Sequence, residues 1–226
     1  MNIAGYIDHT ILKPTTTLSE IKKVCGEATR HGFKAVCIPP PFVKNAKTIL
    51  SDTTVSVATV IGFPFGYNTA KAKLAEVQQA IDDGADELDV VINLVALKSG
   101  AWNYLETEMH QLVEAAHNRG KLIKVIIESG ILTDEEILQC CRIYSKLQVD
   151  FLKTSTGYAE KGASVHAVSL MRANLPESIR IKASGGIRDY EFARQLIAAG
   201  AERLGCSASV AIAEGESSEN GQKGSY

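Results

Sequence analysis

The 226-residue sequence has no long apolar run, little net charge and no cysteine spacing typical of a metal site. It lacks an apolar stretch of membrane-spanning length, and its N-terminus lacks the basic and apolar regions of a signal peptide. Its net charge of −2 and pI of about 6.2 provide no basic footprint for nucleic acid. We therefore expect a cytoplasmic protein that binds neither membranes nor nucleic acid.

The five cysteines form neither a CxxC pair nor a Cys/His cluster at zinc spacing. We interpret them as reduced thiols that act as small apolar side chains. A chain of this length can bury a core without disulfides or structural metals. Cys37 and Cys206 are of interest because each lies near the end of a candidate strand.

Eight short β-rich runs alternate with helical patterns along the chain. They begin near residues 6, 35, 55, 86, 122, 149, 180 and 202. Their nearly continuous Val, Ile and Leu character is typical of parallel strands buried on both faces. Eight alternating units predict a closed (β/α)₈ TIM barrel, with an open doubly wound sheet as the alternative. Without an internal repeat or linker, residues 1–226 are expected to form a single domain.

Helix boundaries are predicted from capping patterns. Thr17 to Glu20 and Thr133 to Glu136 fit capping boxes, and Asn68 and Asp189 can cap two other helices. The last helix is expected to be truncated, because "SASVAIA" is too short for a full outer helix. The polar, Gly/Ser-rich residues 214–226 are expected to form a flexible tail.

Two lysines, Lys153 and Lys182, end the sixth and seventh predicted strands. The working face of such a barrel lies at the carboxyl ends of its strands, so the two amines are expected to meet there. Burial and a neighbouring cation both disfavour an ammonium ion, which favours a nucleophilic amine near neutral pH. The alternative is that both side chains extend to solvent.

Other polar residues are expected to surround the lysines. Asp89 interrupts an apolar strand and could relay protons, or it could form a structural ion pair. Lys124 and Glu128 lie on the fifth strand and are expected to support the charged layer from a distance. His9 is expected to be a hydrogen-bonded structural residue, because no serine or metal-ligand partner is evident.

Small residues follow the last three strands in "STG", "SGGIR" and "GCSAS". Such residues let backbone N–H groups approach a ligand closely, and this region of a barrel commonly binds phosphate. Gly185, Gly186 and Ser207 are the predicted cradle. Arg188 could add charge or remain a solvated surface residue.

These motifs also carry a family resemblance. The series "IDHT.LKP", "GFPFG", "ELDVVIN", "KVIIESG", "FLKTSTG", "IKASGGIR" and the final tyrosine resembles that of the deoxyribose-phosphate aldolase family over essentially the whole chain. The resemblance implies a TIM barrel and a class I, metal-free lyase that needs no cofactor. It implies reversible cleavage of 2-deoxy-D-ribose 5-phosphate to acetaldehyde and D-glyceraldehyde 3-phosphate, in deoxynucleoside catabolism.

The resemblance also assigns roles to individual residues. It implies that Lys153 forms the Schiff base, Lys182 perturbs it, Asp89 relays protons and Asp8 supports the rim. It places phosphate contacts at Gly157, Gly185, Gly186 and Ser207. In this family a C-terminal tyrosine can fold back to aid proton exchange at the acetaldehyde carbon, which implies a catalytic role for Tyr226.

The chain departs from the family pattern at three places. Tyr158 stands where some members have a lysine, "GCSAS" replaces a usual Ser-Ser pair, and Cys37 matches a rim cysteine that would be reactive if exposed. A homo-oligomer, with a dimer favoured, is expected. Alternatives are another lysine-dependent aldolase, a phosphosugar isomerase or epimerase, and a sugar-phosphate sensor without catalysis.

Overall fold

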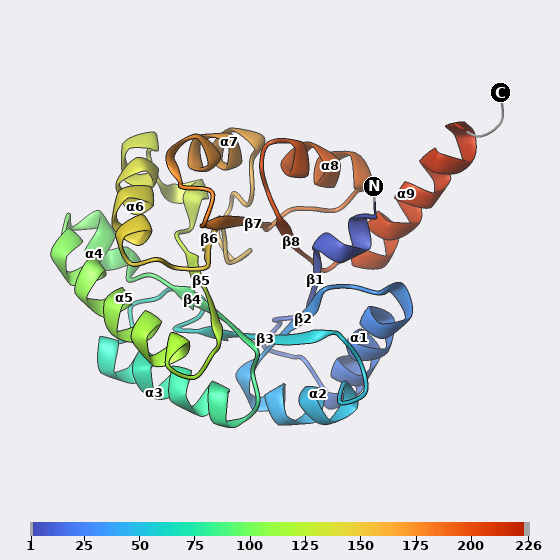
Figure 1. Ribbon diagram of the computed structural model, residues 1–226, viewed down its shortest axis with the longest axis horizontal. Coiled ribbons are helices and arrows are strands. Elements are labelled where there is room, and N and C mark those ends of the chain that lie inside the picture. The colour runs from blue at the N-terminus through green and yellow to red at the C-terminus, as the bar shows by residue number, and fades with distance from the viewer. Residues whose placement is uncertain (1, 224–226) are drawn as a thin grey trace.

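A computed structural model describes residues 2–223, with side chains as far as Glu216. Within these residues eight parallel strands close a barrel in sequential order, and the last strand pairs with the first (Figure 1). The barrel and its alternation with helices confirm the predicted TIM-barrel fold. The strands are Ile7–Thr10 (β1), Ala35–Ile38 (β2), Ser56–Ile61 (β3), Glu87–Val91 (β4), Leu122–Ile126 (β5), Phe151–Lys153 (β6), Arg180–Ser184 (β7) and Arg203–Cys206 (β8).

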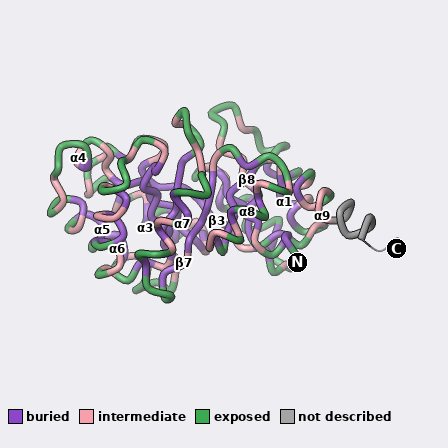
Figure 2. The backbone as a smooth tube through the Cα atoms, turned by 90° about the horizontal axis from the view of Figure 1, so that it is seen from above, coloured by how far each residue is buried: buried purple, intermediate pink, exposed green. Residues whose placement is uncertain are grey.

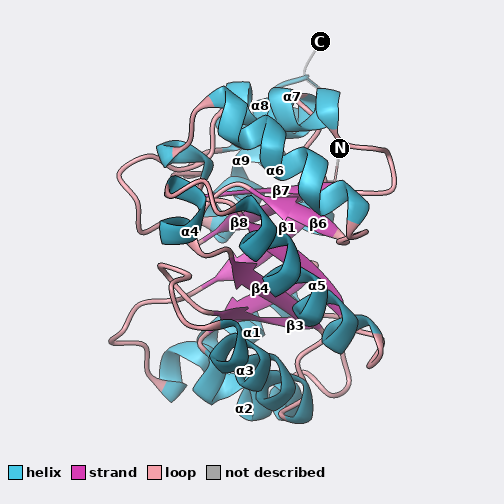
Figure 3. Cartoon of the chain, turned by 90° about the vertical axis from the view of Figure 1, so that its left-hand side faces the viewer, coloured by secondary structure: helices cyan, strands magenta, loops and turns pink. Residues whose placement is uncertain are grey.

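Helices surround the barrel on its outer side (Figures 1 and 3). No helix among residues 2–223 is both long and apolar enough to span a membrane. The α-helices are Leu18–His31 (α1), Val43–Ile49 (α2), Ala70–Asp82 (α3), Leu94–Lys98 (α4), Trp102–His117 (α5), Asp134–Lys146 (α6), Val165–Asn174 (α7), Tyr190–Ala198 (α8) and Ser209–Lys223 (α9). Three short 3₁₀ turns are Ile3–Tyr6 (η1), Pro40–Phe42 (η2) and Ser129–Ile131 (η3).

Local side-chain contacts explain where the helices begin. Thr17 and Thr133 each form a complete capping box with the glutamate three residues later, as predicted. Asp189 caps α8 as predicted. The cap of α3 is Thr69 rather than Asn68, whose amide instead donates to Glu76.

The last helix differs from the prediction. The expected truncated helix is wrong, because α9 has 15 residues and extends to Lys223. The expected flexible tail, residues 214–226, lies partly outside the described residues and stays a prediction. Ser209 and Ile212 are buried at the start of this helix, and Ile3 N–H of η1 donates to Glu216 at 3.0 Å. Contacts made between residues 209 and 216 therefore hold the first two turns of this helix against the rest of the molecule.

Apolar side chains fill the layer between strands and helices, whereas the barrel interior is largely charged. Buried residues gather at the centre of the molecule in Figure 2. Inside the barrel, Cys37, Ala58 and Val60 form a small separate apolar cluster. Below it Phe151 is fully buried, and the Arg180 guanidinium lies 4.0 Å from its ring centroid. Other interior positions carry the buried ionisable side chains of the candidate site.

Candidate active site

The strand register brings Lys153 and Lys182 together. They are aligned partners on the neighbouring strands β6 and β7, so their side chains leave the same face of the sheet. Each Nζ donates to the same atom, Asp89 Oδ2, at 2.7 Å. All three side chains are almost completely buried. The predicted lysine pair and its aspartate therefore share one contact point inside the barrel.

The pKa values of the two lysines are shifted in opposite directions. Burial lowers the pKa of Lys153, and the charge of Lys182 lowers it further against the attraction of Asp89. Burial would also lower the pKa of Lys182, but Asp8 and Asp89 outweigh it and raise that pKa. Lys182 therefore remains an ammonium ion, while Lys153 is the amine that loses its proton more easily.

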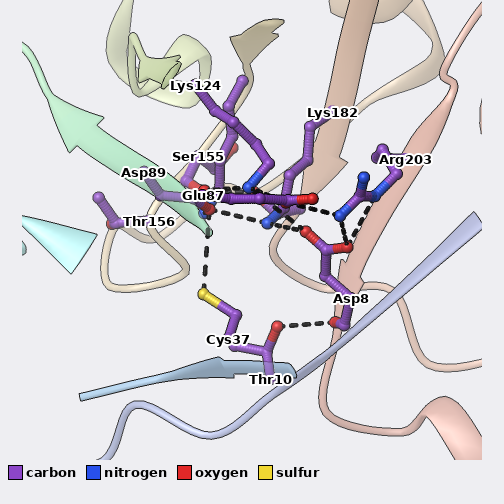
Figure 4. Close-up of polar contacts among 12 residues, drawn as sticks. Asp8, Thr10, Cys37, Glu87, Asp89, Lys124, Ser155, Thr156, Lys182 and Arg203 are labelled. Carbon is purple, nitrogen blue, oxygen red and sulfur yellow. Dashed lines mark hydrogen bonds and ion pairs between the residues drawn. The ribbon is translucent and has the colours of Figure 1, made fainter. Parts of the chain in front are cut away.

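Asp8 holds the far side of Lys182. Its carboxylate accepts from Lys182 Nζ at 2.5 Å and from Arg203 Nε at 2.7 Å (Figure 4). Burial alone would raise the pKa of Asp8, but the charges of Lys182 and Arg203 lower it well below its usual range. The pKa of Asp89 is lowered in the same way by Lys124, Lys153 and Lys182 against its burial. Both carboxyl groups are thus ionised at neutral pH.

Lys124 belongs to this cluster more directly than predicted, and Glu128 does not belong to it. Lys124 Nζ lies 2.6 Å from Asp89 and 2.6 Å from Glu87. Glu128 adopts a left-handed backbone conformation, with φ 55°, and turns its carboxylate to Thr156. The prediction that both residues continue one charged face is therefore wrong for Glu128, because the strand ends at Ile126 before reaching it.

Arg203 and Glu87 are members of the cluster that the sequence reasoning missed. Arg203 Nη2 donates to Glu87 at 2.7 Å, and both side chains are buried. Each residue is the first of its strand, at the amino end of the barrel and away from the carboxyl ends where functional residues are expected. The available signal was alternation: Glu87 is two residues before Asp89 and therefore lies on the same face of β4.

A cavity of about 640 Å³ opens above the cluster. Lys153 lines this cavity, whereas Lys182, Asp89 and Asp8 are buried behind it. Lys153 is thus the member of the lysine pair that a ligand in the cavity could reach. Such a volume accommodates a small phosphorylated metabolite.

The four predicted phosphate contacts line the same cavity. Gly157, Gly185 and Gly186 have φ values of 88°, 88° and 78°, which are favourable for glycine alone. Ser207 follows β8 on the adjoining side. The Ser184 hydroxyl donates to Ser155 O at 2.6 Å, which ties the loops after β6 and β7 to one another. The two loops that carry the predicted glycine contacts are therefore joined by a hydrogen bond.

Several other predicted residues can be placed. Arg188 lines the cavity but is exposed. His9 is a hydrogen-bonded structural residue as expected, although it does have a serine partner, Ser209 Oγ at 2.9 Å, besides Glu27 at 2.8 Å. Ser209 is fully buried and accessible to no substrate. Tyr226 lies outside the described residues.

The departures from the family pattern have structural counterparts. Tyr158 lines the cavity, donates its hydroxyl to Leu12 O at 2.8 Å and packs edge-on against Phe63. It therefore connects the loop after β6 to the loop after β1. Cys37 is fully buried, and burial together with Asp89 raises the pKa of its thiol. Among the described residues, no group of three or more His, Cys, Asp or Glu side chains could hold a metal ion.

Comparisons with known proteins agree with this geometry. The model of the DeoC/LacD family of aldolases matches residues 3–213. The chain belongs to the DeoC/LacD aldolase family. A deoxyribose-phosphate aldolase of Caldanaerobacter subterraneus is 49% identical over 215 residues, covering 95% of this chain and 93% of that protein.

Solved structures of the family have the same barrel. A putative deoxyribose-phosphate aldolase from Coccidioides immitis is 40% identical, with a TM-score of 0.90 over 94% of this chain and 85% of that one. The deoxyribose phosphate aldolase from Aeropyrum pernix, described as a unique tetramer, is 31% identical, with a TM-score of 0.90 over 96% of this chain and 92% of that one.

Proposed function

We propose that this protein is a class I aldolase that reversibly cleaves 2-deoxy-D-ribose 5-phosphate to acetaldehyde and D-glyceraldehyde 3-phosphate. The observation that carries the proposal is a buried lysine of lowered pKa, Lys153, which lines a cavity while a permanently charged lysine lies behind it. Membership of the aldolase family and full-length relatives named deoxyribose-phosphate aldolase support the choice of substrate.

The reaction begins at Lys153. Its neutral Nζ adds to the aldehyde carbon C1 of the open-chain sugar, and the carbinolamine loses water to give an iminium ion. Lys182 remains charged throughout and keeps Lys153 from regaining its own proton. Asp89 accepts hydrogen bonds from both amines and orients them toward the same point.

Carbon–carbon cleavage follows from the iminium. The C3 hydroxyl loses its proton, C3 becomes the aldehyde carbon of glyceraldehyde 3-phosphate, and the electron pair of the C2–C3 bond moves into the iminium to give an enamine. A water molecule linked to Asp89 and Lys182 takes the hydroxyl proton, and C2 of the enamine then gains a proton to give a new iminium ion. Water then hydrolyses the new iminium, releasing acetaldehyde and neutral Lys153.

The phosphate group is assigned to the glycine-lined end of the cavity. Gly157, Gly185, Gly186 and Ser207 would contact it through backbone N–H groups and the serine hydroxyl. Arg188 would contribute charge from the rim. Holding the phosphate there positions C1 over Lys153, so that binding energy far from the reacting bond helps the chemistry.

Tyr226 is assigned to the protonation of the enamine carbon. The residue is the last of the chain, and the assignment depends on the family resemblance alone. Deleting Tyr226 is expected to slow proton exchange at the acetaldehyde methyl group more than it slows adduct formation. Hydrogen–deuterium exchange of acetaldehyde, followed by NMR, measures that step directly.

The protein is further proposed to act in the cytoplasm as a homo-oligomer, with a dimer favoured, on small sugar-phosphate and aldehyde substrates and without metal or cofactor. Free cysteines at all five positions are compatible with a reducing compartment. The tetrameric relative is the reason to measure the subunit number by light scattering.

Borohydride trapping tests the proposed reaction. The protein is incubated with 2-deoxyribose 5-phosphate and excess chelator, reduced with borohydride and digested for mass spectrometry, and released acetaldehyde is assayed in parallel. We expect turnover and one adduct on Lys153, both lost in Lys153→Leu and kept in Lys71→Leu, which alters an exposed lysine. Consumption of the substrate with neither an adduct nor acetaldehyde would indicate an isomerase or epimerase, and binding alone a sensor. An adduct without acetaldehyde release would indicate another lysine aldolase.

A further inference from the structure

The buried charges below Lys153 form a closed cycle. Starting from Asp8, each side chain contacts the next, and the sixth contacts the first again (Figure 4). We call these six residues the ionic ring. Its contacts are Asp8–Lys182 at 2.5 Å, Lys182–Asp89 at 2.7 Å, Asp89–Lys124 at 2.6 Å, Lys124–Glu87 at 2.6 Å, Glu87–Arg203 at 2.7 Å and Arg203–Asp8 at 2.7 Å.

The ionic ring is electrically balanced and shielded from water. Three carboxylates alternate with three cations, and no member is more than 4% exposed. The members come from β1, β4, β5, β7 and β8, so the ring spans the barrel interior. In such a site a charge interacts more strongly with its neighbours than it does in water, and an imbalance is not screened by solvent.

Lys153 is not one of the six residues whose charges cancel in the ionic ring. It contacts the ring at one member, Asp89, whose charge is already matched by the ring's own cations. An ammonium ion at Lys153 would be a fourth cation beside three carboxylates. Two other ionisable groups lie near Lys153. Burial and Asp89 raise the pKa of the Cys37 thiol, and burial raises the pKa of Glu128, which attracts Lys153 electrostatically but makes its hydrogen bonds to Thr156 outside the ring.

We infer that Glu87, Lys124 and Arg203, which do not line the cavity, are positioning residues that complete a neutral ring and thereby set how readily Lys153 releases its proton. The inference rests on the proposed role of Lys153 as the reacting amine. It assigns a function to the amino ends of β4 and β8, on the side of the barrel away from the substrate.

The ring predicts opposite effects for opposite charge changes. Glu87→Gln removes a negative charge and leaves a net positive ring, so Lys153 should lose its proton at lower pH. Lys124→Met leaves a net negative ring, so Lys153 should hold its proton to higher pH. Each shift is expected to be about one pH unit. The double variant removes one contacting pair of opposite charge and restores neutrality, so its midpoint should return to that of the wild type.

Two measurements follow the proton on Lys153. The first is the midpoint of the acid limb of kcat/KM against pH, which reports ionisation of the free enzyme. The second is the pH dependence of acetylation of Lys153 by acetic anhydride, followed by peptide mass spectrometry without any substrate. Arg203→Met provides a second cation-removing variant if Lys124→Met does not fold. Arg203→Lys keeps the charge and should keep the wild-type midpoint even if its activity falls.

The results show whether the ring charges control the ionisation of Lys153 or only stabilise the fold. Opposite shifts in the two single variants and a return in the double variant support the inference. Shifts in the same direction, or unchanged midpoints in folded variants, would overturn it. Failure of the wild type to cleave deoxyribose phosphate would refute the proposed function instead, while the acetylation midpoints would still test the ring.

Discussion

At the scale of single residues, access rather than burial distinguishes Lys153 from the other buried lysines. The described residues contain four buried lysines, and burial also lowers the pKa of Lys73. Lys73, however, donates to Val91 O and Glu108 and does not line the cavity. The lowered pKa therefore supports the proposed nucleophile at Lys153 and not at Lys73, because only Lys153 of the two lines the cavity.

Cys37 is expected to be unreactive in the folded protein. Its side chain is fully buried, and its raised thiol pKa leaves little thiolate at neutral pH. Iodoacetamide at pH 8 should leave both Cys37 and aldolase activity unchanged, whereas the same reagent in denaturant should label all five cysteines. Peptide mass spectrometry gives the result, and rapid labelling of native Cys37 with loss of activity would contradict it.

Gly185 is expected to be needed for phosphate binding. An added Cβ would meet Gly162 Cα at 3.0 Å, and φ at this position is +88°. Gly185→Ala should raise KM for the phosphorylated substrate about tenfold, equivalent to about 1.4 kcal/mol. Gly26→Ala is the matched control, because Gly26 lies in α1 with open space around it. The control should keep KM and stabilise the fold by about 0.5–1 kcal/mol. Equal KM values in both variants would argue against the assigned cradle.

At the scale of helices and strands, most elements could be predicted because their causes are local. Burial of both faces marks the strands, and capping boxes mark the starts of α1 and α6. One of the two ring partners of Asp8, Arg203, could not be predicted. Arg203 is 195 residues away from Asp8 in the sequence. In the sequence alone, an arginine at the first position of a strand cannot be distinguished from one that is exposed to solvent. The length of α9 was missed because its first turns are held by contacts with distant segments.

The tie between Glu128 and Thr156 is expected to hold the loop that carries Gly157. Thr156 N–H and hydroxyl both donate to the Glu128 carboxylate, which is buried. Thr156→Val keeps the shape of the side chain but leaves the carboxylate with one donor fewer. We expect a loss of about 1.5–3 kcal/mol in unfolding free energy and a higher KM. Urea unfolding measures the first and substrate saturation the second. Thr48→Val, at an exposed hydroxyl on α2, should change neither.

At the scale of the whole molecule, the ionic ring joins the first strand to β4, β5, β7 and β8. Asp8 on β1 contacts Lys182 on β7 and Arg203 on β8, alongside the backbone pairing of β1 with β8. Asp8→Asn should lower the unfolding free energy by about 3–5 kcal/mol, because it leaves buried cations unmatched. Asp82→Asn, in an exposed pair with Arg119, should lower it by less than about 1 kcal/mol. Similar losses in both variants, measured by urea unfolding at pH 7, would contradict the ring's part in closing the barrel.

The same pair of variants predicts how stability depends on pH. The pKa of Asp8 is lowered in the folded protein, so between the folded value and about 3.9 the unfolded chain binds more protons. The contribution of Asp8 is therefore fully present above the unfolded value and is lost as pH falls toward the folded one. As pH falls from about 4.5 to about 2.5, the urea midpoint should fall steeply for the wild type and for Asp82→Asn. It should fall less for Asp8→Asn, which has no carboxyl group there to protonate. Parallel curves for all three proteins would mean that Asp8 is not held as a carboxylate by Lys182 and Arg203.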